Sequence, residues 1–325
     1  MKKRVVSGNR PTGKLHIGHH HGALKNWIEL QDKYECFFFV ADWHALTTKY
    51  DETKNLRSDI KEMVVDWLAA GLDPSKCTIY RQSDLSEVAE LSLYFSMITP
   101  ISWLERCPTY KEMISEINYK DISTHGFLGY PILQTADIVL YHGELVPVGE
   151  DQLPHLELGR EIVRRFNYLY GQYFPEPEAI LSPTKRVLGT DGRKMSKSYG
   201  NAINLSDTPE EILKKVQTII TDPARIKKTD PGHPDVCLVF GLHKVYSVDV
   251  DKIKEECRAG EIGCVQCKKI LAERISESLA DFRKRRTELD KNSDEVWNIL
   301  REGAEKVRPI ARETLNKIRK RMNLD

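Results

Sequence analysis

The stretch Arg10-Pro11-Thr12-Gly13-Lys14-Leu15-His16-Ile17-Gly18-His19 decides the fold, because it joins a strand pattern to a helix pattern. The strand pattern is the short apolar run 4–8 that precedes it. The helix pattern follows it, with apolar residues at helical spacing: Ala23, Leu24, Trp27, Ile28 and Leu30. The stretch therefore predicts a strand, a glycine-containing turn and a helix whose first turn carries His16, Gly18 and His19.

The start of this predicted helix is suited to binding an anion. Its unpaired backbone N–H groups and its dipole face a ligand, and the imidazoles of His16 and His19 can donate hydrogen bonds to a phosphate. Because Gly18 has no side chain, a flat ring such as adenine can pack against the backbone. A histidine-containing turn with no ligand is the alternative interpretation, and the pattern also suits other nucleotidyl transferases.

A second motif lies about one α/β domain further along the chain. It reads Lys194-Met195-Ser196-Lys197-Ser198 and follows the glycine-containing run 189–193. Two lysines in a mobile loop can close over a triphosphate and neutralise the charge of the leaving pyrophosphate. A solvated basic turn is the alternative for such a loop by itself. The two motifs in this order favour ATP chemistry, with His16, His19, Lys194 and Lys197 stabilising the transition state.

The first 200 residues alternate between strand and helix patterns. Continuous apolar runs at 35–42 and 77–80 predict strands buried on both faces, and 54–68 and 87–98 predict helices. This alternation indicates α/β architecture, a doubly wound parallel sheet of the Rossmann type. Ligands bind beyond the C-terminal ends of such strands. His44 lies at one of these ends, as a wall of the substrate site or as a structural hydrogen-bonding residue.

Composition is typical of a globular protein with two domains. The chain has 325 residues, 40% hydrophobic and 30% charged, with a net charge of +1. We expect a catalytic domain over 1–200, with an insertion at about 99–125, and a helical domain over 201–325 whose last helix packs back on the first. No apolar stretch is long enough to span a membrane and no signal peptide is evident, so we expect a cytoplasmic protein.

A helix is predicted to begin near Pro131 and to carry an acidic residue among apolar neighbours. Tyr130, Gln134 and Asp137 are spaced by four and three residues, so one helix face presents all three. A buried Asp137 without a partner would be costly. A ligand donor such as an indole N–H is one partner, and nearby protein donors are the alternative.

A strand pattern at 145–148 is followed by an acidic and amide cluster, 150–152. Asp151 is expected to cap a helix that runs through Asn167. Further on, 205–210 predicts another helix start, capped by Asp207 or Thr208. Two basic runs, 283–286 and 317–321, can meet phosphates or form solvated helix faces.

Four of the seven cysteines have metal-ligand spacing. Cys237, Cys257, Cys264 and Cys267 follow the pattern C-x19-C-x6-C-x2-C. The C-x-x-C pair places two thiols on one turn, which suits a metal site. Zinc is the generic interpretation of four cysteines, and unliganded core thiols are the alternative.

The two motifs, with the stretches 126–167 and 189–201, resemble the class I aminoacyl-tRNA synthetases, and closely the bacterial-type tryptophanyl-tRNA synthetases. The resemblance implies activation of tryptophan by ATP with Mg²⁺, transfer to tRNA(Trp), and a homodimer whose interface includes part of 99–125. It also implies a [4Fe–4S] cluster on the four cysteines, as in a subset of the family, with Zn²⁺ as the alternative. Tyrosyl-tRNA synthetase and a non-catalytic paralogue that binds RNA or amino acid are the rival functions.

The resemblance also assigns binding residues. Asp137 would accept the indole N–H, and Val6 stands where tyrosyl enzymes place a tyrosine. Gln134 and Arg10 depart from the residues common at their positions, Met and Gln. The implied tryptophan-binding residues are Val6, His44, Tyr130, Gln134, Asp137, Val146, Val148 and Gln152. The implied ATP-binding residues are Arg10, Pro11, Thr12, Gly18, His19, Lys111, Gly149, Glu150, Asp151, Val187, Lys194, Met195, Ser196, Lys197 and Ser198.

Overall fold

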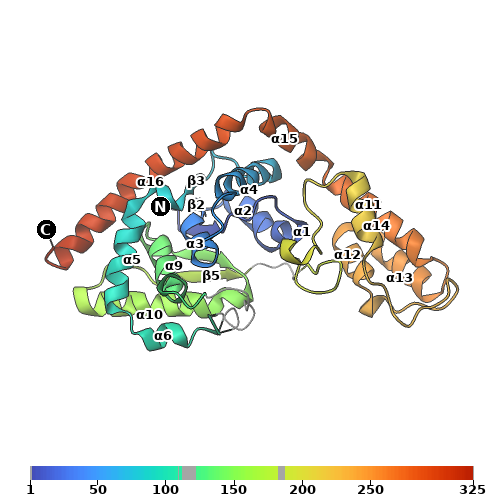
Figure 1. Cartoon of the computed structure of the whole chain (residues 1–325), viewed down its shortest axis with the longest axis horizontal. Helices are drawn as coiled ribbons and strands as arrows, with labels where there is room; N and C mark the ends of the chain where they lie inside the picture. The colour runs from blue at the N-terminus through green and yellow to red at the C-terminus, as the bar shows by residue number, and fades with distance from the viewer. Residues whose placement is uncertain (1, 109, 112–121, 182–186, 325) are drawn as a thin grey trace. The chain divides into compact units, whose positions relative to one another are not determined.

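The computed structural model describes residues 2–108, 110–111, 122–181 and 187–324 (Figure 1). The chain divides into two compact units. The first contains residues 1–13, 25–183 and 292–325, and the second contains 14–24 and 184–291. The first motif is thus split, because Arg10 belongs to one unit while His16 and His19 belong to the other. The sequence pattern predicted a single boundary near residue 200, whereas these two units each combine segments that are distant in sequence.

The first unit is built on a five-stranded sheet in the order β3-β2-β1-β4-β5. All strand pairs are parallel, which confirms the predicted doubly wound α/β class. The strand order reverses at β1, and ligands bind in such sheets at this reversal, beyond the C-terminal strand ends. The strands are β1 (Arg4–Asn9), β2 (Glu35–Val40), β3 (Thr78–Arg81), β4 (Leu145–Val148) and β5 (Glu178–Leu181).

Both faces of the sheet are buried because alternate side chains of β2 point to opposite sides. On one side Phe38 stacks on Trp27, with ring centroids 4.5 Å apart, and Trp27 meets Trp67 edge to face. On the other side Phe37 and Phe39 join a core with residues of several helices. The first side is covered by α2 (Lys25–Leu30) and α4 (Leu56–Ala70), and the second by α5 (Ser86–Ile98), α9 (Tyr130–Val139), α10 (Leu153–Tyr170) and α16 (Ser293–Arg321).

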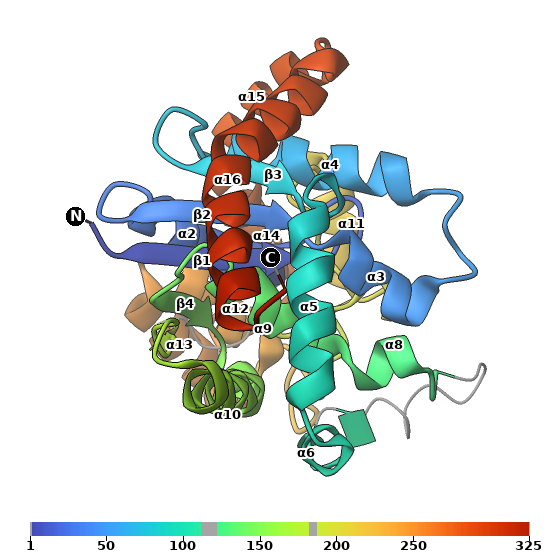
Figure 2. The same cartoon turned by 90° about the vertical axis from the view of Figure 1, so that its left-hand side faces the viewer.

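The last helix, α16, belongs to the first unit, where it packs against β3, α4 and α5 (Figure 2). Its Gly303 lies so close to β3 that an added Cβ would overlap the carbonyl oxygen of Ile79. Arg312 lies 3.2 Å from the Glu87 carboxylate, and Arg308 lies 3.7 Å from it. A backbone approach that only glycine permits and a shared buried carboxylate therefore fix α16 on the sheet.

The described part of the second unit is mainly helical. Thr208 caps its first long helix in a reciprocal capping box with Glu211, which confirms one of the two predicted caps. The apolar core includes Ile212, Val216 and Leu271. Its helices include α11 (Pro209–Gln217), α12 (Leu238–Tyr246), α13 (Val250–Arg258), α14 (Cys264–Ser278) and α15 (Ala280–Asp290).

One local expectation differs from the structure. Asp151 is not the N-cap of α10, because Glu150–Gln152 forms a 3₁₀ turn and the α-helix begins only at Leu153, after Gln152. The predicted insertion at about 99–125 contains the short helix α6 (Ile101–Glu105). Its residues 109 and 112–121 lie outside the described part. None of the helices described is long and apolar enough to cross a bilayer.

Candidate active site

The histidine motif begins a short helix in the second unit. Helix α1 (Ile17–His19) continues into a π-helical turn, His20–Leu24. His16 Nδ1 accepts the backbone N–H of His19, and His19 Nδ1 accepts that of His16, both at 3.3 Å. The two rings stack with centroids 3.7 Å apart. Because both Nδ1 atoms accept, the proton of each neutral ring lies on Nε2, which leaves Nε2–H as a donor to a ligand.

Burial and neighbouring lysines keep these two histidines uncharged. Burial, then Lys197 and Lys194, lower the pKa of His16 to about 4. Burial, then His16 and the same lysines, lower the pKa of His19 to about 3. Both rings are therefore neutral at pH 7, and they serve as hydrogen-bond donors while the lysines carry the positive charge.

The lysine loop lies beside the histidine motif within the same unit. A Cβ added to Gly18 would lie 2.9 Å from His16 Nδ1 and 3.5 Å from Met195 Cβ, so this position has room only for hydrogen. The backbone N–H of Ile17 donates to the carbonyl of Ile203 over 2.9 Å, just after the loop. The structure thus brings the two predicted motifs together and leaves the Lys194 and Lys197 side chains exposed.

A buried amide that the sequence did not indicate holds the lysine loop. Asn201, only 2% exposed, accepts the backbone N–H of Ser196 at 2.7 Å. Its amide donates to the Asp191 carboxylate at 2.8 Å and to the Lys194 carbonyl at 3.1 Å. One side chain therefore closes the segment 191–201 into a fixed turn.

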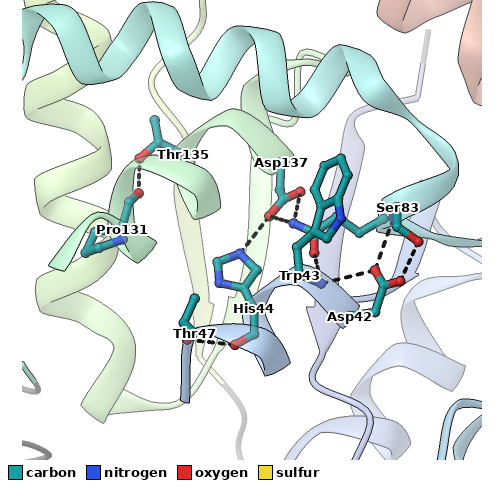
Figure 3. A network of polar contacts seen from close by, with 9 residues as sticks. Asp42, Trp43, His44, Thr47, Ser83, Pro131, Thr135 and Asp137 are labelled. Atoms are coloured by element: carbon teal, nitrogen blue, oxygen red, sulfur yellow. Dashed lines mark hydrogen bonds and ion pairs between the residues drawn. The ribbon is translucent and has the colours of Figure 1, made fainter. Parts of the chain in front are cut away.

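The predicted indole acceptor, Asp137, is the centre of a buried network in the first unit (Figure 3). His44 Nε2 lies 2.9 Å from Asp137 Oδ2. Gln82 Nε2 donates to both carboxylate oxygens, at 2.8 and 2.9 Å, while its Oε1 accepts the backbone N–H of Trp43. Burial raises the pKa of Asp137, and the bonds from His44 and Gln82 oppose that rise.

This arrangement bears on both interpretations of Asp137. Protein donors do cap the carboxylate, as the alternative required. A carboxylate offers about four lone-pair sites, and the His44 and Gln82 contacts occupy three of them. By this count the fourth lone-pair site is not used by His44 or Gln82. Gln82 was not predicted from the sequence, although it follows β3 directly and a position at a C-terminal strand end was an available signal.

A second acid supports the segment that carries His44. Asp42 accepts the backbone N–H of Ser83 at 3.0 Å and its hydroxyl at 2.5 Å, and also accepts the N–H of Trp43. Figure 3 shows this pair on the far side of Trp43 from Asp137. These bonds tie the start of α3 (Asp42–Lys49) to the turn after β3.

The other predicted tryptophan-binding residues also belong to the first unit. Tyr130 hydroxyl is hydrogen-bonded to His155 Nε2. Val5 is paired with Leu145 across β1 and β4, which places Val6 beside Val146 in adjacent strands. Val148 and Gln134 are half-buried. Gln152 donates to the Asp151 carboxylate at 3.2 Å.

The predicted ATP-binding residues are divided between the units. The first unit contains Arg10, Pro11 and Thr12 directly after β1, Gly149, Glu150 and Asp151 directly after β4, and Lys111, which is exposed. A Cβ at Gly149 would lie 2.7 Å from Asp151 Oδ1. The second unit contains Val187, which is 8% exposed, and the lysine loop with Met195, Ser196 and Ser198.

The four predicted metal-ligating cysteines lie in the second unit and influence one another. Burial, followed by Cys237, Cys257 and Cys264, raises the pKa of Cys267 to about 12. Arg225 Nη1 lies 3.9 Å from Cys257 Sγ and 4.0 Å from Cys264 Sγ. Within the described ranges no group of three or more His, Cys, Asp or Glu side chains is already arranged as a metal site.

The chain belongs to the class I tRNA synthetases for tryptophan and tyrosine (W and Y), whose family model matches residues 1–280. The tryptophan–tRNA ligase of Thermotoga maritima is 51% identical, with 99% of each chain covered. The tryptophan–tRNA ligase of Aquifex aeolicus is 47% identical, covering 99% of this chain and all of the relative. The similarity to ligases of this specificity thus extends over the whole length.

Solved structures show the same similarity. Tryptophanyl-tRNA synthetase from Campylobacter jejuni, in complex with ADP and tryptophan, matches with a TM-score of 0.88 and 34% identity, covering 99% of this chain and 100% of that one. Tyrosyl-tRNA synthetase from Archaeoglobus fulgidus matches with a TM-score of 0.67 and 22% identity, covering 88% and 90% of the two chains. The second match supports the fold alone.

Proposed function

We propose that this protein is a tryptophan–tRNA ligase, which activates L-tryptophan with ATP and transfers it to tRNA(Trp). The observation that carries the choice of tryptophan is the buried Asp137 carboxylate, held by His44 and Gln82, which leave its fourth lone-pair site unused. An indole N–H is a donor without an acceptor function, so it matches a buried acceptor. Full-length relatives of the same specificity support the choice.

Activation needs no covalent enzyme intermediate. The tryptophan carboxylate attacks the α-phosphorus of ATP in line, and the bond to the bridging oxygen of pyrophosphate breaks. His16 and His19 donate from Nε2 to phosphate oxygens, while Lys194 and Lys197 neutralise the charge that develops on pyrophosphate. Mg²⁺, carried in on the ATP phosphates, supplies additional charge neutralisation. Positioning and electrostatics provide most of the rate enhancement.

The other predicted residues complete the proposed sites. Arg10, Pro11, Thr12, Gly149, Glu150 and Asp151 follow the ends of β1 and β4, where nucleotides bind in this class of sheet. The helical part after residue 200 is proposed to contact the anticodon of tRNA. A cytoplasmic location, expected from the sequence, stays a prediction.

The decisive experiment is ATP–pyrophosphate exchange dependent on amino acid, run separately with tryptophan and tyrosine. Exchange with tryptophan alone is the expected result. Exchange with tyrosine alone would keep the chemistry and overturn Asp137 as an indole partner. Absence of exchange with either, together with intact RNA binding, would favour the non-catalytic paralogue.

Two substitutions assign the roles within that assay. Asp137→Ala is expected to weaken tryptophan binding by about tenfold or more, since a buried hydrogen bond to a charged group is lost. Lys197→Ala is expected to lower the exchange rate far more than the affinity for tryptophan. Unaltered tryptophan binding in the first variant, or an unchanged rate in the second, would contradict the corresponding assignment.

We also propose that the four cysteines hold a metal group, a [4Fe–4S] cluster in preference to Zn²⁺. The donor set fits, because the other three thiols contribute to the raised pKa of Cys267. Arg225 Nη1 also lies within 4.0 Å of the sulfur atoms of Cys257 and Cys264. A Cβ added at Gly232 would lie 2.6 Å from Cys257 Sγ, so the backbone can approach this thiol so closely only because residue 232 is a glycine. Bound there, a cluster would cross-link the segment before α12 to α13 and α14.

Metal analysis of anaerobically purified protein tests this site. Iron with acid-labile sulfide, lost in Cys264→Ser, is the expected result. Zinc in place of iron would keep the site and change its occupant. The buried Cys36→Ser is the matched control, because Cys36 is a thiol of β2 remote in sequence from the four. A protein that binds neither metal under these conditions would refute the proposal.

A homodimer is proposed on the basis of an apolar surface. Leu93 and Met97 on α5, four residues apart on one helix face, are 54% and 68% exposed, and Ile101 on α6 is 63% exposed. Clustered exposed side chains of this kind mark interfaces. Met97→Glu is expected to shift the protein from dimer to monomer in light scattering. Val248→Glu, at an exposed valine of the second unit, is the control and should leave the mass unchanged.

A further inference from the structure

A pocket rich in arginine lies within the first unit, apart from the residues assigned to tryptophan and ATP. Its volume is about 320 Å³, and it is formed by α4, the end of β3 with the following turn, and α16. Arg57, Arg81, Arg301 and Arg308 line it together with Trp297 and Asp84. Four guanidinium groups from three segments distant in sequence therefore converge on one cavity.

Two of these arginines are not neutralised by an acidic partner. The Arg57 guanidinium lies 4.2 Å from the centre of the Trp297 ring and has no hydrogen-bond or ion-pair partner among the described residues. Within the part of the chain that the structure describes, Arg301 donates only to the neutral Asn298 side chain, at 2.9 Å. Both side chains are exposed at the rim.

The acids nearby do not balance the charge of the pocket. Asp84 is paired with Arg81. Arg308 donates to the Asp84 carbonyl at 2.8 Å and lies 3.7 Å from Glu87, a carboxylate that it shares with Arg312. Glu305 is the one further acid of the lining. The local excess is therefore positive, although the whole chain has a net charge of only +1.

We propose that this pocket binds the phosphodiester backbone of tRNA. A guanidinium presents two parallel N–H donors that match two phosphate oxygens, which makes arginine the residue suited to this contact. Stacking on Trp297 holds the plane of Arg57 and lowers the entropy lost when a phosphate is bound. This inference rests on the proposed function, which supplies tRNA as the polyanionic partner.

The position of the charges favours an RNA strand over a free anion. A small anion is bound best where it is enclosed, whereas Arg57 and Arg301 stand at the rim on two different helices and face solvent. Charges spread along an open rim can follow successive phosphates of a strand, and aromatic–guanidinium pairs are common partners of such strands. Phosphate contacts of this kind fix the position of RNA without reading its sequence.

The salt dependence of tRNA binding tests the proposal. Dissociation constants are measured for the wild type, Arg57→Gln and Arg301→Gln with a tRNA(Trp) transcript at several salt concentrations. Each substitution is expected to weaken binding several-fold at low salt. Each should reduce the slope of log K against log salt by about 0.7–0.9, the value for one lost phosphate contact. Arg57→Lys should restore most of the slope, because it keeps the charge.

Arg165→Gln is the matched control, because Arg165 is also exposed and lies 5.7 Å from a tryptophan ring, that of Trp103, outside the pocket. Equal affinities and slopes for Arg57→Gln and Arg165→Gln would overturn the proposal. Inorganic phosphate and pyrophosphate, titrated separately, form the second arm. If Arg57→Gln no longer binds phosphate or pyrophosphate but binds tRNA as the wild type does, the RNA contact is overturned in favour of a small-anion site.

Tryptophan-dependent ATP–pyrophosphate exchange separates this inference from the function on which it rests. That reaction requires no tRNA, so the wild type and all pocket variants should exchange at equal rates. An inactive wild type would refute the ligase function. An active wild type whose pocket variants bind tRNA with unchanged affinity and salt dependence would refute only the RNA contact.

Discussion

Gln82 Nε2 lies 2.8 and 2.9 Å from the two carboxylate oxygens of Asp137, so a single amide group donates to both oxygens of this buried acid. The other end of the amide accepts the backbone N–H of Trp43 at 3.1 Å. Gln82 thus connects the turn after β3, the start of α3 and α9. It fixes the orientation of the carboxylate that is proposed to receive the indole N–H.

Gln82→Ala is therefore expected to raise KM for tryptophan. Loss of these bonds costs about 1–2 kcal/mol, equivalent to roughly 5–30-fold, while KM for ATP should stay near the wild-type value. Steady-state exchange kinetics with each substrate varied in turn provide the measurement.

Gln31→Ala is the control for a general loss of stability. Gln31 is also buried and also bridges backbone groups, those of Gly71 and Asp73. It should lower the melting temperature without changing KM for tryptophan. If both variants raise that KM equally, Gln82 has no special part in positioning Asp137.

The sheet and the motifs could be predicted from the sequence because their signals are local. Continuous apolar runs placed β2 and β3 to within a few residues. The partners of Gln82 and Asn201 could not be predicted, because they lie 55 positions away or across a turn. The cap at Asp151 was wrong for a related reason: the intervening 3₁₀ turn delays the start of α10.

Gly303→Ala should destabilise the first unit. The added methyl group would overlap the Ile79 carbonyl oxygen of β3, so α16 would have to move away from the strand. Overpacking of this kind costs about 1–3 kcal/mol, measurable as a lower midpoint in urea denaturation.

Gly241→Ala is the matched control, and it is expected to raise the urea denaturation midpoint instead of lowering it. Gly241 lies inside α12 with no atom within 4 Å of a Cβ added there. Alanine is favoured over glycine in a helix by about 0.5–1 kcal/mol, so this variant should be slightly more stable than the wild type. Equal effects of the two substitutions would mean that the close approach of α16 to β3 is not needed.

The two motif histidines should stay neutral well below the pH at which free histidine titrates. Their pKa values are lowered by burial, to about 4 for His16 and about 3 for His19, against about 6.5 in the unfolded chain. Between pH 6.5 and about 4 the unfolded state then binds more protons than the folded state. The free energy of unfolding should therefore fall as the pH is lowered through this range.

Imidazole chemical shifts measured from pH 8 to 5 give the direct check. Signals assigned through His16→Asn and His19→Asn should remain at their neutral positions over this range. The double variant should also lose less stability than the wild type between pH 7 and 5. A titration midpoint near 6.5 for either ring would contradict the lowering of its pKa by burial and by the neighbouring lysines.

Asn201→Ala should slow activation while leaving tryptophan binding intact. Asn201 makes three hydrogen bonds that close the lysine loop, to Ser196, Asp191 and Lys194. Without them Lys194 and Lys197 must be ordered when ATP binds, so the exchange rate is expected to fall about tenfold or more, which corresponds to about 1.4 kcal/mol. KM for tryptophan should change little, because Asp137 belongs to the other unit.

Asn167→Ala is the matched control. Asn167 also makes three hydrogen bonds to the backbone of a loop, at Tyr173 and Phe174, but in the first unit. It should lower stability to a similar extent with a near-normal exchange rate at a temperature where both variants are folded. If Asn167→Ala reduces the rate as much as Asn201→Ala, then a general loosening of the protein, and not a fixed lysine loop, accounts for the effect.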